Sequence, residues 1–223
     1  MFSSILFDLD GTLLDTLDDL ANSCNRSLAS MGFPTHEREA YRYFVGDGLG
    51  MLMSRALPAP HRDDPATVER GQVAFREDYS RNWNVATRLY QGMTELLDEL
   101  TDRKLRLAVL SNKPHEFTAA CCNHYLHQWP FEIVMGQTDD FPRKPHPAAA
   151  LEVARRMDER PENFLYVGDT ATDMQTAVSA GMYPVGALWG FRTRQELEDA
   201  GARTVIDHPM ELLKLLENRV SPA

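Results

Sequence analysis

The sequence is poor in cysteine and in basic residues, and each shortage excludes a class of protein. Its three cysteines, Cys24, Cys121 and Cys122, form neither a disulfide framework nor a Cys-x-x-Cys metal site. The 23 Lys and Arg residues are outnumbered by 33 Asp and Glu residues, which leaves a formal net charge of −10. Broad nucleic-acid binding is therefore not expected. An anionic ligand would need local positive potential, from a bound divalent metal or one or two lysines.

Long apolar segments are also missing. No apolar run approaches the length of a membrane span. The first residues carry no basic region and reach Asp8 too early for a secretion signal. We therefore expect a cytoplasmic protein without a membrane partner. Hydrophobic residues at 43% and charged residues at 25% are typical of an ordinary globular chain.

Short apolar runs bounded by turn residues predict buried β-strands, because both of their faces are apolar. Segments with helical spacing separate the runs, and this alternation predicts a parallel, doubly wound α/β core of the Rossmann-like kind. The predicted strands are Ile5–Leu9, Leu105–Leu110, Phe131–Met135 and Phe164–Val167, with weaker candidates at Tyr183–Leu188 and Thr204–Ile206. The predicted helices are Met93–Leu100, Pro147–Met157 (with Ala150, Leu151, Ala154 and Met157 on one stripe) and Thr170–Ala180.

One stretch, residues 15–88, breaks this alternation. It contains no convincing buried strand, and it is too long for a loop. Apolar residues recur in it at helical spacing, for example at Val73, Phe75 and Tyr79. We therefore predict a core made of residues 1–14 and 89–223, and an inserted all-helical cap domain over 15–88.

Two carboxylates follow the first predicted strand, at Asp8 and Asp10, with Gly11 after them. Ligands of open α/β sheets bind at the carboxyl ends of the strands. Two acids at this spacing can divide nucleophilic and acid–base roles. An isolated Asp-x-Asp is more often a pair of solvated acids in a turn. Its meaning therefore depends on what lies at the other strand ends.

The other strand ends carry groups suited to a phosphoryl ligand. Ser111 and Asn112 offer a hydroxyl and a backbone N–H. Lys144, just before a helix, offers a compact positive charge. Asp169 and Asp173, four residues apart at a helix start, add hard oxygen ligands that suit Mg²⁺. Taken singly, these are an ordinary turn, a surface lysine and a helix cap. As an ordered set they predict one phosphoryl site.

The same residues resemble four motifs of the haloacid dehalogenase superfamily. Asp8-Leu9-Asp10-Gly11-Thr12 resembles the first motif, and Ser111-Asn112-Lys113 the second. Lys144-Pro145 resembles the third, and Gly168-Asp169 with Asp173 the fourth. The helical insertion resembles a subgroup with a small cap. Within that subgroup, Gly46-Asp47-Gly48 and Tyr90-Gln91-Gly92 look like segments of phosphoglycolate phosphatases.

The resemblance implies a Mg²⁺-dependent phosphomonoester hydrolase with an aspartyl-phosphate intermediate. Asp8 would be the nucleophile, and Asp10 would protonate the leaving oxygen and then activate water. Asp8, the backbone carbonyl of Asp10 and Asp169 would bind Mg²⁺. Asp173 would orient the metal's waters or Lys144.

The resemblance also implies how phosphate is held. Ser111 and the backbone of Asn112 would bind its oxygens, and Lys144 would offset charge on Asp8 and phosphate. A dehalogenase proper does not keep the second acid of the first motif. The presence of Asp10 therefore favours a phosphatase.

Substrate choice is expected to come from the cap, where glycines let backbone amides approach a small acid. The candidate loop contains Gly46, Asp47 and Gly48, and Arg42 or Arg55 could meet a substrate carboxylate. A flexible turn with surface arginines is an equally good interpretation. We expect 2-phosphoglycolate as the substrate, a small phosphorylated metabolite as the partner, and a monomer or homodimer.

Several alternatives stay open on the sequence. A phosphosugar mutase, a pyrophosphatase, a nucleotidase or another small-metabolite phosphatase could use the same scaffold. A phospho-accepting signalling module also has a strand-end aspartate, metal acids and a lysine. The insertion after the first strand and the acid–base candidate Asp10 favour an enzyme over that module.

Overall fold

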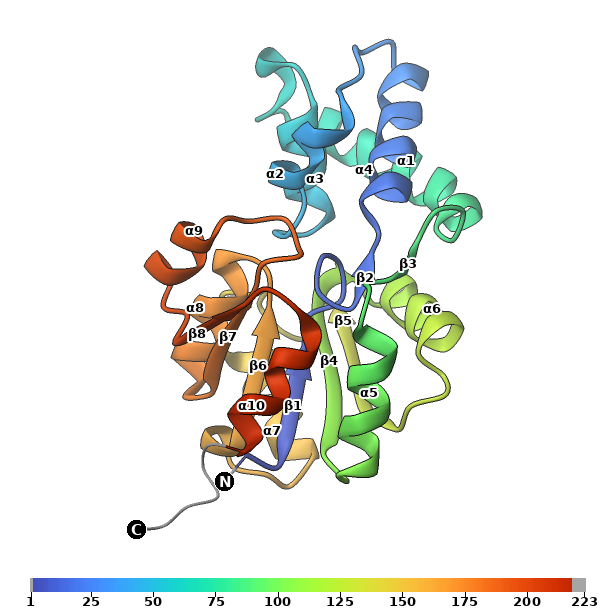
Figure 1. Ribbon diagram of the computed structural model, residues 1–223. Helices are drawn as coiled ribbons and strands as arrows, with labels where there is room; N and C mark the ends of the chain where they lie inside the picture. The colour runs from blue at the N-terminus through green and yellow to red at the C-terminus, as the bar shows by residue number, and fades with distance from the viewer. Residues whose placement is uncertain (1, 218–223) are drawn as a thin grey trace.

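The computed structural model describes residues 2–217, which form a parallel sheet with helices on both faces and a helical cap over one edge (Figure 1). The sheet has six strands in the order β5-β4-β1-β6-β7-β8, so β1 lies at its centre. All six predicted strand segments are confirmed. The strands are β1 (Ser4–Phe7), β4 (Arg106–Pro114), β5 (Phe131–Gln137), β6 (Phe164–Gly168), β7 (Tyr183–Ala187) and β8 (Thr204–Ile206).

Alternate side chains of each strand face opposite sides of the sheet, and both sides are covered. Ile5 and Phe7 pack in one hydrophobic cluster, while Leu6 between them packs in another. Helices α5 (Met93–Asp102), α6 (His115–Tyr125) and α10 (Leu212–Glu217) contribute to the first cluster; α7 (Ala148–Arg156) and α8 (Ala171–Ala180) contribute to the second. The predicted doubly wound, Rossmann-like core is therefore confirmed.

The remaining elements of the core are short. Helix α9 (Arg194–Asp199) lies against the β7–β8 end of the sheet, where Leu197 meets Gly186. Short 3₁₀ helices occupy Pro161–Asn163 and Pro209–Glu211 in the core, and two more occupy Arg38–Ala40 and Ala59–His61 in the cap. No helix within residues 2–217 is both long enough and apolar enough to cross a membrane.

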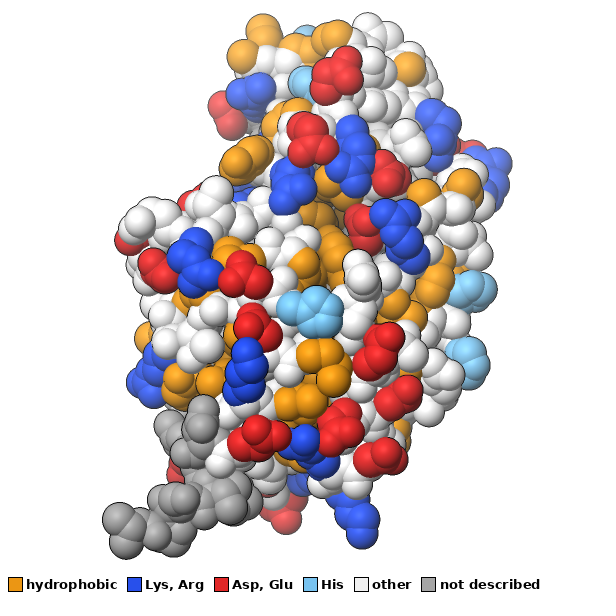
Figure 2. Space-filling model, viewed as in Figure 1, with side chains coloured by type: hydrophobic (Ala, Val, Ile, Leu, Met, Phe, Trp, Pro, Cys, Tyr) orange, Lys and Arg blue, Asp and Glu red, His pale blue; other side chains and the backbone are white. Residues whose placement is uncertain are grey.

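The cap is built around four α-helices and stands above the carboxyl ends of the strands (Figure 1). The helices are α1 (Leu17–Ser30), α2 (Tyr41–Phe44), α3 (Leu49–Ala56) and α4 (Pro65–Asn82). They enclose a hydrophobic cluster of their own, and Phe117 and Phe191 of the core join that cluster. In the space-filling view, hydrophobic side chains show where cap and core meet, with charged side chains of both signs around them (Figure 2).

Two residues of the predicted helical stripes are exposed instead of buried. Val73 is 60% exposed and Leu151 is 41% exposed. Val73 is two residues from Phe75, which places it roughly 200° away around the helix, on the solvent side. The buried face of α4 is formed by residues spaced four apart, namely Thr67, Gly71, Phe75 and Tyr79.

The chain passes between core and cap twice, and the two passages run side by side. Strand β2 (Leu14–Asp15) pairs antiparallel with β3 (Arg88–Leu89), and an Asp15–Arg88 ion pair of 2.7 Å joins them. The carboxylate of Asp19, in the first turn of α1, accepts the Thr87 N–H at 2.9 Å and the Thr87 hydroxyl at 2.7 Å. We retain residues 15–88 as the proposed extent of the cap.

Candidate active site

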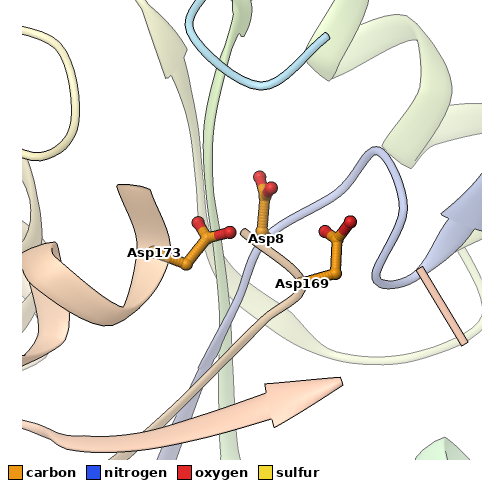
Figure 3. Close-up of side chains that lie close together, drawn as sticks. All are labelled: Asp8, Asp169 and Asp173. Atoms are coloured by element: carbon orange, nitrogen blue, oxygen red, sulfur yellow. The ribbon is translucent and has the colours of Figure 1, made fainter. Parts of the chain in front are cut away.

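Three acids come together at the carboxyl edge of the sheet (Figure 3). Asp8 follows β1, Asp169 follows β6, and Asp173 lies in the first turn of α8. All three are buried, and one carboxylate oxygen of each lies within 4.8 Å of the others. Neighbouring parallel strands end at the same edge of a sheet, so residues more than 150 positions apart in sequence become neighbours.

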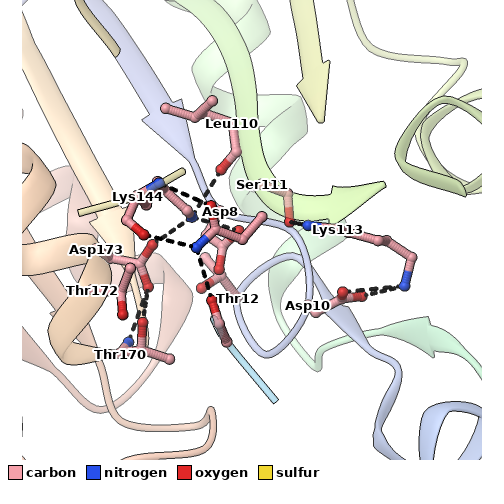
Figure 4. Close-up of polar contacts among 12 residues, drawn as sticks. Asp8, Asp10, Thr12, Leu110, Ser111, Lys113, Lys144, Thr170, Thr172 and Asp173 are labelled. Carbon is pink, nitrogen blue, oxygen red and sulfur yellow. Dashed lines mark hydrogen bonds and ion pairs between the residues drawn. The ribbon is translucent and has the colours of Figure 1, made fainter. Parts of the chain in front are cut away.

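Lys144 is the buried cation of this cluster (Figure 4). Its Nζ lies 3.0 Å from Asp8 Oδ1 and 2.7 Å from Asp173 Oδ1, and it donates to the Leu110 carbonyl oxygen at 3.1 Å. Burial alone would lower the pKa of Lys144, but the negative charges of Asp173 and Asp8 raise it well above its ordinary value. The lysine is therefore held as a positive charge beside the first acid.

Asp173 is occupied by protein contacts on both of its oxygens. Oδ1 accepts from Lys144 at 2.7 Å, and Oδ2 accepts from the Thr170 N–H at 3.0 Å and the Thr170 hydroxyl at 2.7 Å. Thr170 and Asp173 form a capping box at the start of α8. This geometry suits a residue that orients Lys144.

Asp169 is oriented by contacts from two distant loops. The Thr12 hydroxyl donates to Oδ1 at 2.9 Å, and the Phe191 N–H donates to Oδ2 at 2.8 Å. Gly11 has a φ of +84°, and a Cβ there would stand 2.3 Å from Asp169 Oδ2. Only glycine combines that conformation with so close an approach.

The carboxylates have not exhausted their capacity to bind a cation. Burial and repulsion by Asp173 raise the pKa of Asp8 to about 7, against the opposing effect of Lys144. Burial and the charges of Asp173 and Asp8 also raise the pKa of Asp169. Asp8 Oδ1 lies within ion-pair range of Lys144, yet no donor in residues 2–217 is aligned with it for a hydrogen bond. Hard oxygen donors that repel one another fit a small divalent cation such as Mg²⁺.

Asn112 uses its side chain to hold loops together. Its Nδ2 donates to the carbonyl oxygens of Gly46 and Lys144, both at 3.1 Å, and its Oδ1 accepts from the Lys144 N–H at 2.9 Å. Ser111 Oγ accepts the Lys113 N–H at 3.3 Å. Both Ser111 and Asn112 border the same cavity as Asp8, so their positions agree with the predicted phosphate cradle.

The cavity between cap and core has a volume of about 40 Å³. The core contributes its polar wall, with Asp8, Asp10 and Ser111 among its residues. The cap contributes a mainly apolar wall from Leu20, Val45, Leu49, Leu52 and Phe75. One water needs roughly 10–15 Å³ by the same measure, so the space holds only a few water-sized groups with the cap in this position.

The predicted specificity loop divides into two parts. Gly46 and Gly48 border the cavity, whereas Asp47 does not line it. Asp47 accepts the Thr172 hydroxyl at 2.8 Å and pairs with Arg55 at 2.5 Å. Asp47 therefore joins the cap to α8 of the core.

The two candidate arginines are engaged away from the cavity. Arg42 donates to the carbonyl oxygen of Gly190, and Arg55 donates to that of Phe44 at 3.2 Å in addition to its pair with Asp47. Neither arginine lines the cavity. That either arginine meets a substrate carboxylate stays a prediction, and it would require the side chain to leave these contacts.

Two residues of the site had no role in the sequence interpretation. Lys113 Nζ contacts both carboxylate oxygens of Asp10, at 3.0 and 3.1 Å, and donates to the Tyr79 hydroxyl at 2.8 Å. Lys113 follows Ser111 and Asn112 directly, so its place in that motif was a usable signal. No sequence signal marked Tyr79 as a residue of the site, because its distance from Asp10 depends on how the cap sits on the core.

Comparison with known proteins identifies a family and several relatives of this chain. The family model of haloacid dehalogenase-like hydrolases matches residues 5–187. A phosphoglycolate phosphatase of Pseudomonas putida is 32% identical over 222 residues, covering 98% of this chain and 80% of that protein. One of Aquifex aeolicus is 29% identical over 217 residues and covers 97% of each chain.

Solved structures agree with these relatives. The crystal structure of a predicted phosphoglycolate phosphatase from Haemophilus somnus is similar with a TM-score of 0.89 at 27% identity, over 96% of this chain and 98% of that one. The matches extend across the core motifs and the cap together. The chain belongs to the haloacid dehalogenase-like hydrolase family.

Proposed function

We propose that the protein is a Mg²⁺-dependent phosphatase that acts on a small phosphate ester through an aspartyl-phosphate at Asp8. The observation that carries this proposal is the surroundings of Asp8. Its buried carboxylate lies 3.0 Å from the Lys144 ammonium, within reach of Asp169, and on a cavity that Ser111 also lines. Phosphoryl transfer needs positioning and charge neutralisation more than covalent assistance, and these residues supply both.

In the first step, an Asp8 oxygen attacks phosphorus and the ester oxygen leaves. The Ser111 hydroxyl, the Asn112 backbone N–H and Lys144 hold the phosphoryl oxygens. Asp10 gives a proton to the leaving oxygen, so that an alcohol rather than an alkoxide departs.

In the second step, Asp10 takes a proton from water as the water attacks phosphorus. The bond between Asp8 and phosphorus breaks, and inorganic phosphate is released. Asp10 returns to its first protonation state, and Asp8 is again a free carboxylate.

Mg²⁺ would be held by Asp8, the backbone carbonyl of Asp10 and Asp169. Once bound, it neutralises charge on the carboxylates and on the phosphoryl group. Asp173 is not needed as a ligand, since both of its oxygens already accept hydrogen bonds. Its proposed role is to keep Lys144 beside Asp8.

The proposed substrate is 2-phosphoglycolate, a small phosphorylated metabolite. Support comes from the relatives named phosphoglycolate phosphatase. A cytoplasmic location remains a prediction from the sequence.

A substrate panel tests the proposal. Phosphate release would be measured for 2-phosphoglycolate, sugar phosphates, nucleotides and pyrophosphate, each with Mg²⁺ and with EDTA. We expect 2-phosphoglycolate to be the fastest and EDTA to stop turnover. A preference for sugar phosphates or pyrophosphate would contradict the substrate, and an isomer in place of free phosphate would indicate a mutase. A phosphorylated Asp8 that persists for minutes without turnover would indicate a signalling module.

A further inference from the structure

A buried lysine connects the carboxylate of Asp10 to the cap. Lys113 Nζ lies 3.0 and 3.1 Å from the two oxygens of Asp10, and 2.8 Å from the hydroxyl oxygen of Tyr79 (Figure 4 shows the contact with Asp10). The side chain of Lys113 is 3% exposed, and Tyr79 is fully buried. An ammonium group has three N–H donors, and these three acceptors match them.

The three residues come from three parts of the fold. Asp10 lies in the loop after β1, Lys113 lies near the end of β4, and Tyr79 lies on α4 of the cap. The contact therefore joins the proposed acid–base residue of the core to a helix of the cap. The three residues are far apart in the sequence, with 103 positions between Asp10 and Lys113 and 34 between Tyr79 and Lys113.

The ring of Tyr79 is fixed on both sides. It stacks on Phe75 within α4, with ring centroids 5.1 Å apart, and meets the edge of Phe117 on α6 at 5.0 Å. Lys113 Nζ also lies 4.7 Å from the ring centroid. The phenol oxygen is thus held at one place relative to the core, where it constrains the direction of the lysine.

We propose that Lys113 and Tyr79 are positioning residues that hold the carboxylate of Asp10 in line with the leaving oxygen. Without the hydroxyl of Tyr79, one donor of Lys113 loses its acceptor and the ammonium can turn, and Asp10 turns with it. A displacement of about 1 Å at a reacting group can slow a reaction by roughly a hundredfold. The inference rests on the proposed function, because Asp10 matters only if a leaving group must be protonated.

The test compares two esters of similar size that differ in their need for a proton. Acetyl phosphate releases acetate, which leaves without protonation, whereas ethyl phosphate releases an alkoxide that needs a proton. The measurement is kcat/KM for each ester, taken from single-turnover reactions with excess enzyme. In Tyr79→Phe we expect kcat/KM for ethyl phosphate to fall about tenfold, the size expected for a hydrogen bond to a charged group, while acetyl phosphate changes less than about twofold.

The matched control is Tyr41→Phe. Tyr41 is also a fully buried tyrosine of the cap, but its hydroxyl donates to Asn25 within the cap, at 2.6 Å. The Tyr41→Phe variant should keep the wild-type ratio of kcat/KM for ethyl phosphate to kcat/KM for acetyl phosphate. Lys113→Met removes the contacts with both Asp10 and Tyr79, so it should lower that ratio further than Tyr79→Phe does.

The outcomes are distinct. Equal slowing of both esters in Tyr79→Phe, or no slowing of either, would overturn the inference, since a purely structural loss affects the two alike. If Lys113→Met does not fold, Tyr79→Phe alone decides, because it keeps the ring and its packing. Failure of the proposed function looks different, since wild type and Asp8→Asn would then release phosphate from 2-phosphoglycolate at the same rate or not at all.

Discussion

The phosphoryl site and the substrate-facing side of the cap are built in different ways. In the core, Lys144 and Asp173 have side chains that are 2% and 0% exposed, and each contacts partners from other elements. In the cap, the polar pair Arg55–Asp47 has side chains that are 31% and 29% exposed. The cap residues that do face the cavity are mostly apolar.

This difference has a physical consequence. A buried charge cannot be left without its partner, because removing one member leaves the other uncompensated in a medium of low dielectric constant. In a partly exposed pair such as Arg55–Asp47, each member can exchange its partner for water at little cost. Substitutions in the core site should therefore abolish activity or stability, whereas polar substitutions in the cap should have graded effects. The following predictions test this contrast, from the largest expected effect to the smallest.

The substitution Asp8→Asn should have the largest effect on activity. An amide is not a useful nucleophile, so turnover of 2-phosphoglycolate should fall by on the order of 10⁴-fold or more. The melting temperature should stay close to that of wild type, because the change removes a buried acid that Asp173 repels. Phosphate release and thermal melting followed by circular dichroism measure the two effects. Activity near the wild-type level would end the proposed mechanism.

The substitution Lys144→Met should have the largest effect on stability. It leaves Asp8 and Asp173 buried without their cation, and breaking such a pair costs about 3–5 kcal/mol of unfolding free energy. Urea unfolding measures this quantity. The control is Lys214→Met, whose exposed pair with Glu211 at 3.0 Å should contribute less than about 1 kcal/mol. Equal losses in the two variants would contradict the contrast between buried and exposed pairs.

Addition of Mg²⁺ should raise the melting temperature of the wild type. Binding only to the folded state stabilises it by about 2.7 kcal/mol when free Mg²⁺ is a hundred times its dissociation constant. Asp169→Asn removes a proposed ligand and should lose most of this stabilisation. Thermal melting in Mg²⁺ and in EDTA separates the cases without any activity measurement. If wild type and variant respond to Mg²⁺ alike, the proposed metal ligands are wrong.

The substitution Asp47→Asn should have the smallest effect of the four. It weakens the contacts with Thr172 and Arg55, which are partly exposed, so we expect KM to change only a few-fold and kcat to stay near the wild-type value. Steady-state kinetics with 2-phosphoglycolate measures both constants. A hundredfold loss of kcat would mean that this part of the cap acts directly in the reaction, against the contrast drawn above.

Much of the fold could be predicted because its signals are local. The run Ile5, Leu6 and Phe7 predicts the central strand. Its side chains are apolar on both faces because helices cover both faces of the sheet. The burial stripes of helices were less predictable. Val73 and Leu151 are apolar in sequence but exposed, since which side of a helix is buried depends on what packs against it.

The residues of the site also divide into those that local sequence signals mark and those that only the tertiary structure brings together. Asp8, Asp169 and Lys144 could be singled out because each lies next to a strand or helix boundary that the sequence marks. The contact of Lys113 with Tyr79 could not be predicted in this way, and neither could the pairing of β2 with β3. Both join segments that are separated by more than 30 residues, and each depends on the placement of the cap over the core.

The sequence by itself determined the succession of strands and helices along the chain and the chemical groups at the strand ends. Hydrophobic periodicity and turn residues act over a few positions, so they can be read locally. Only the tertiary structure decided which groups meet. It brought Lys144 between Asp8 and Asp173, engaged Arg42 and Arg55 away from the cavity, and joined Asp10 to the cap through Lys113. These contacts follow from burial and from satisfying charges in the interior, which depend on the whole chain rather than on neighbours in sequence.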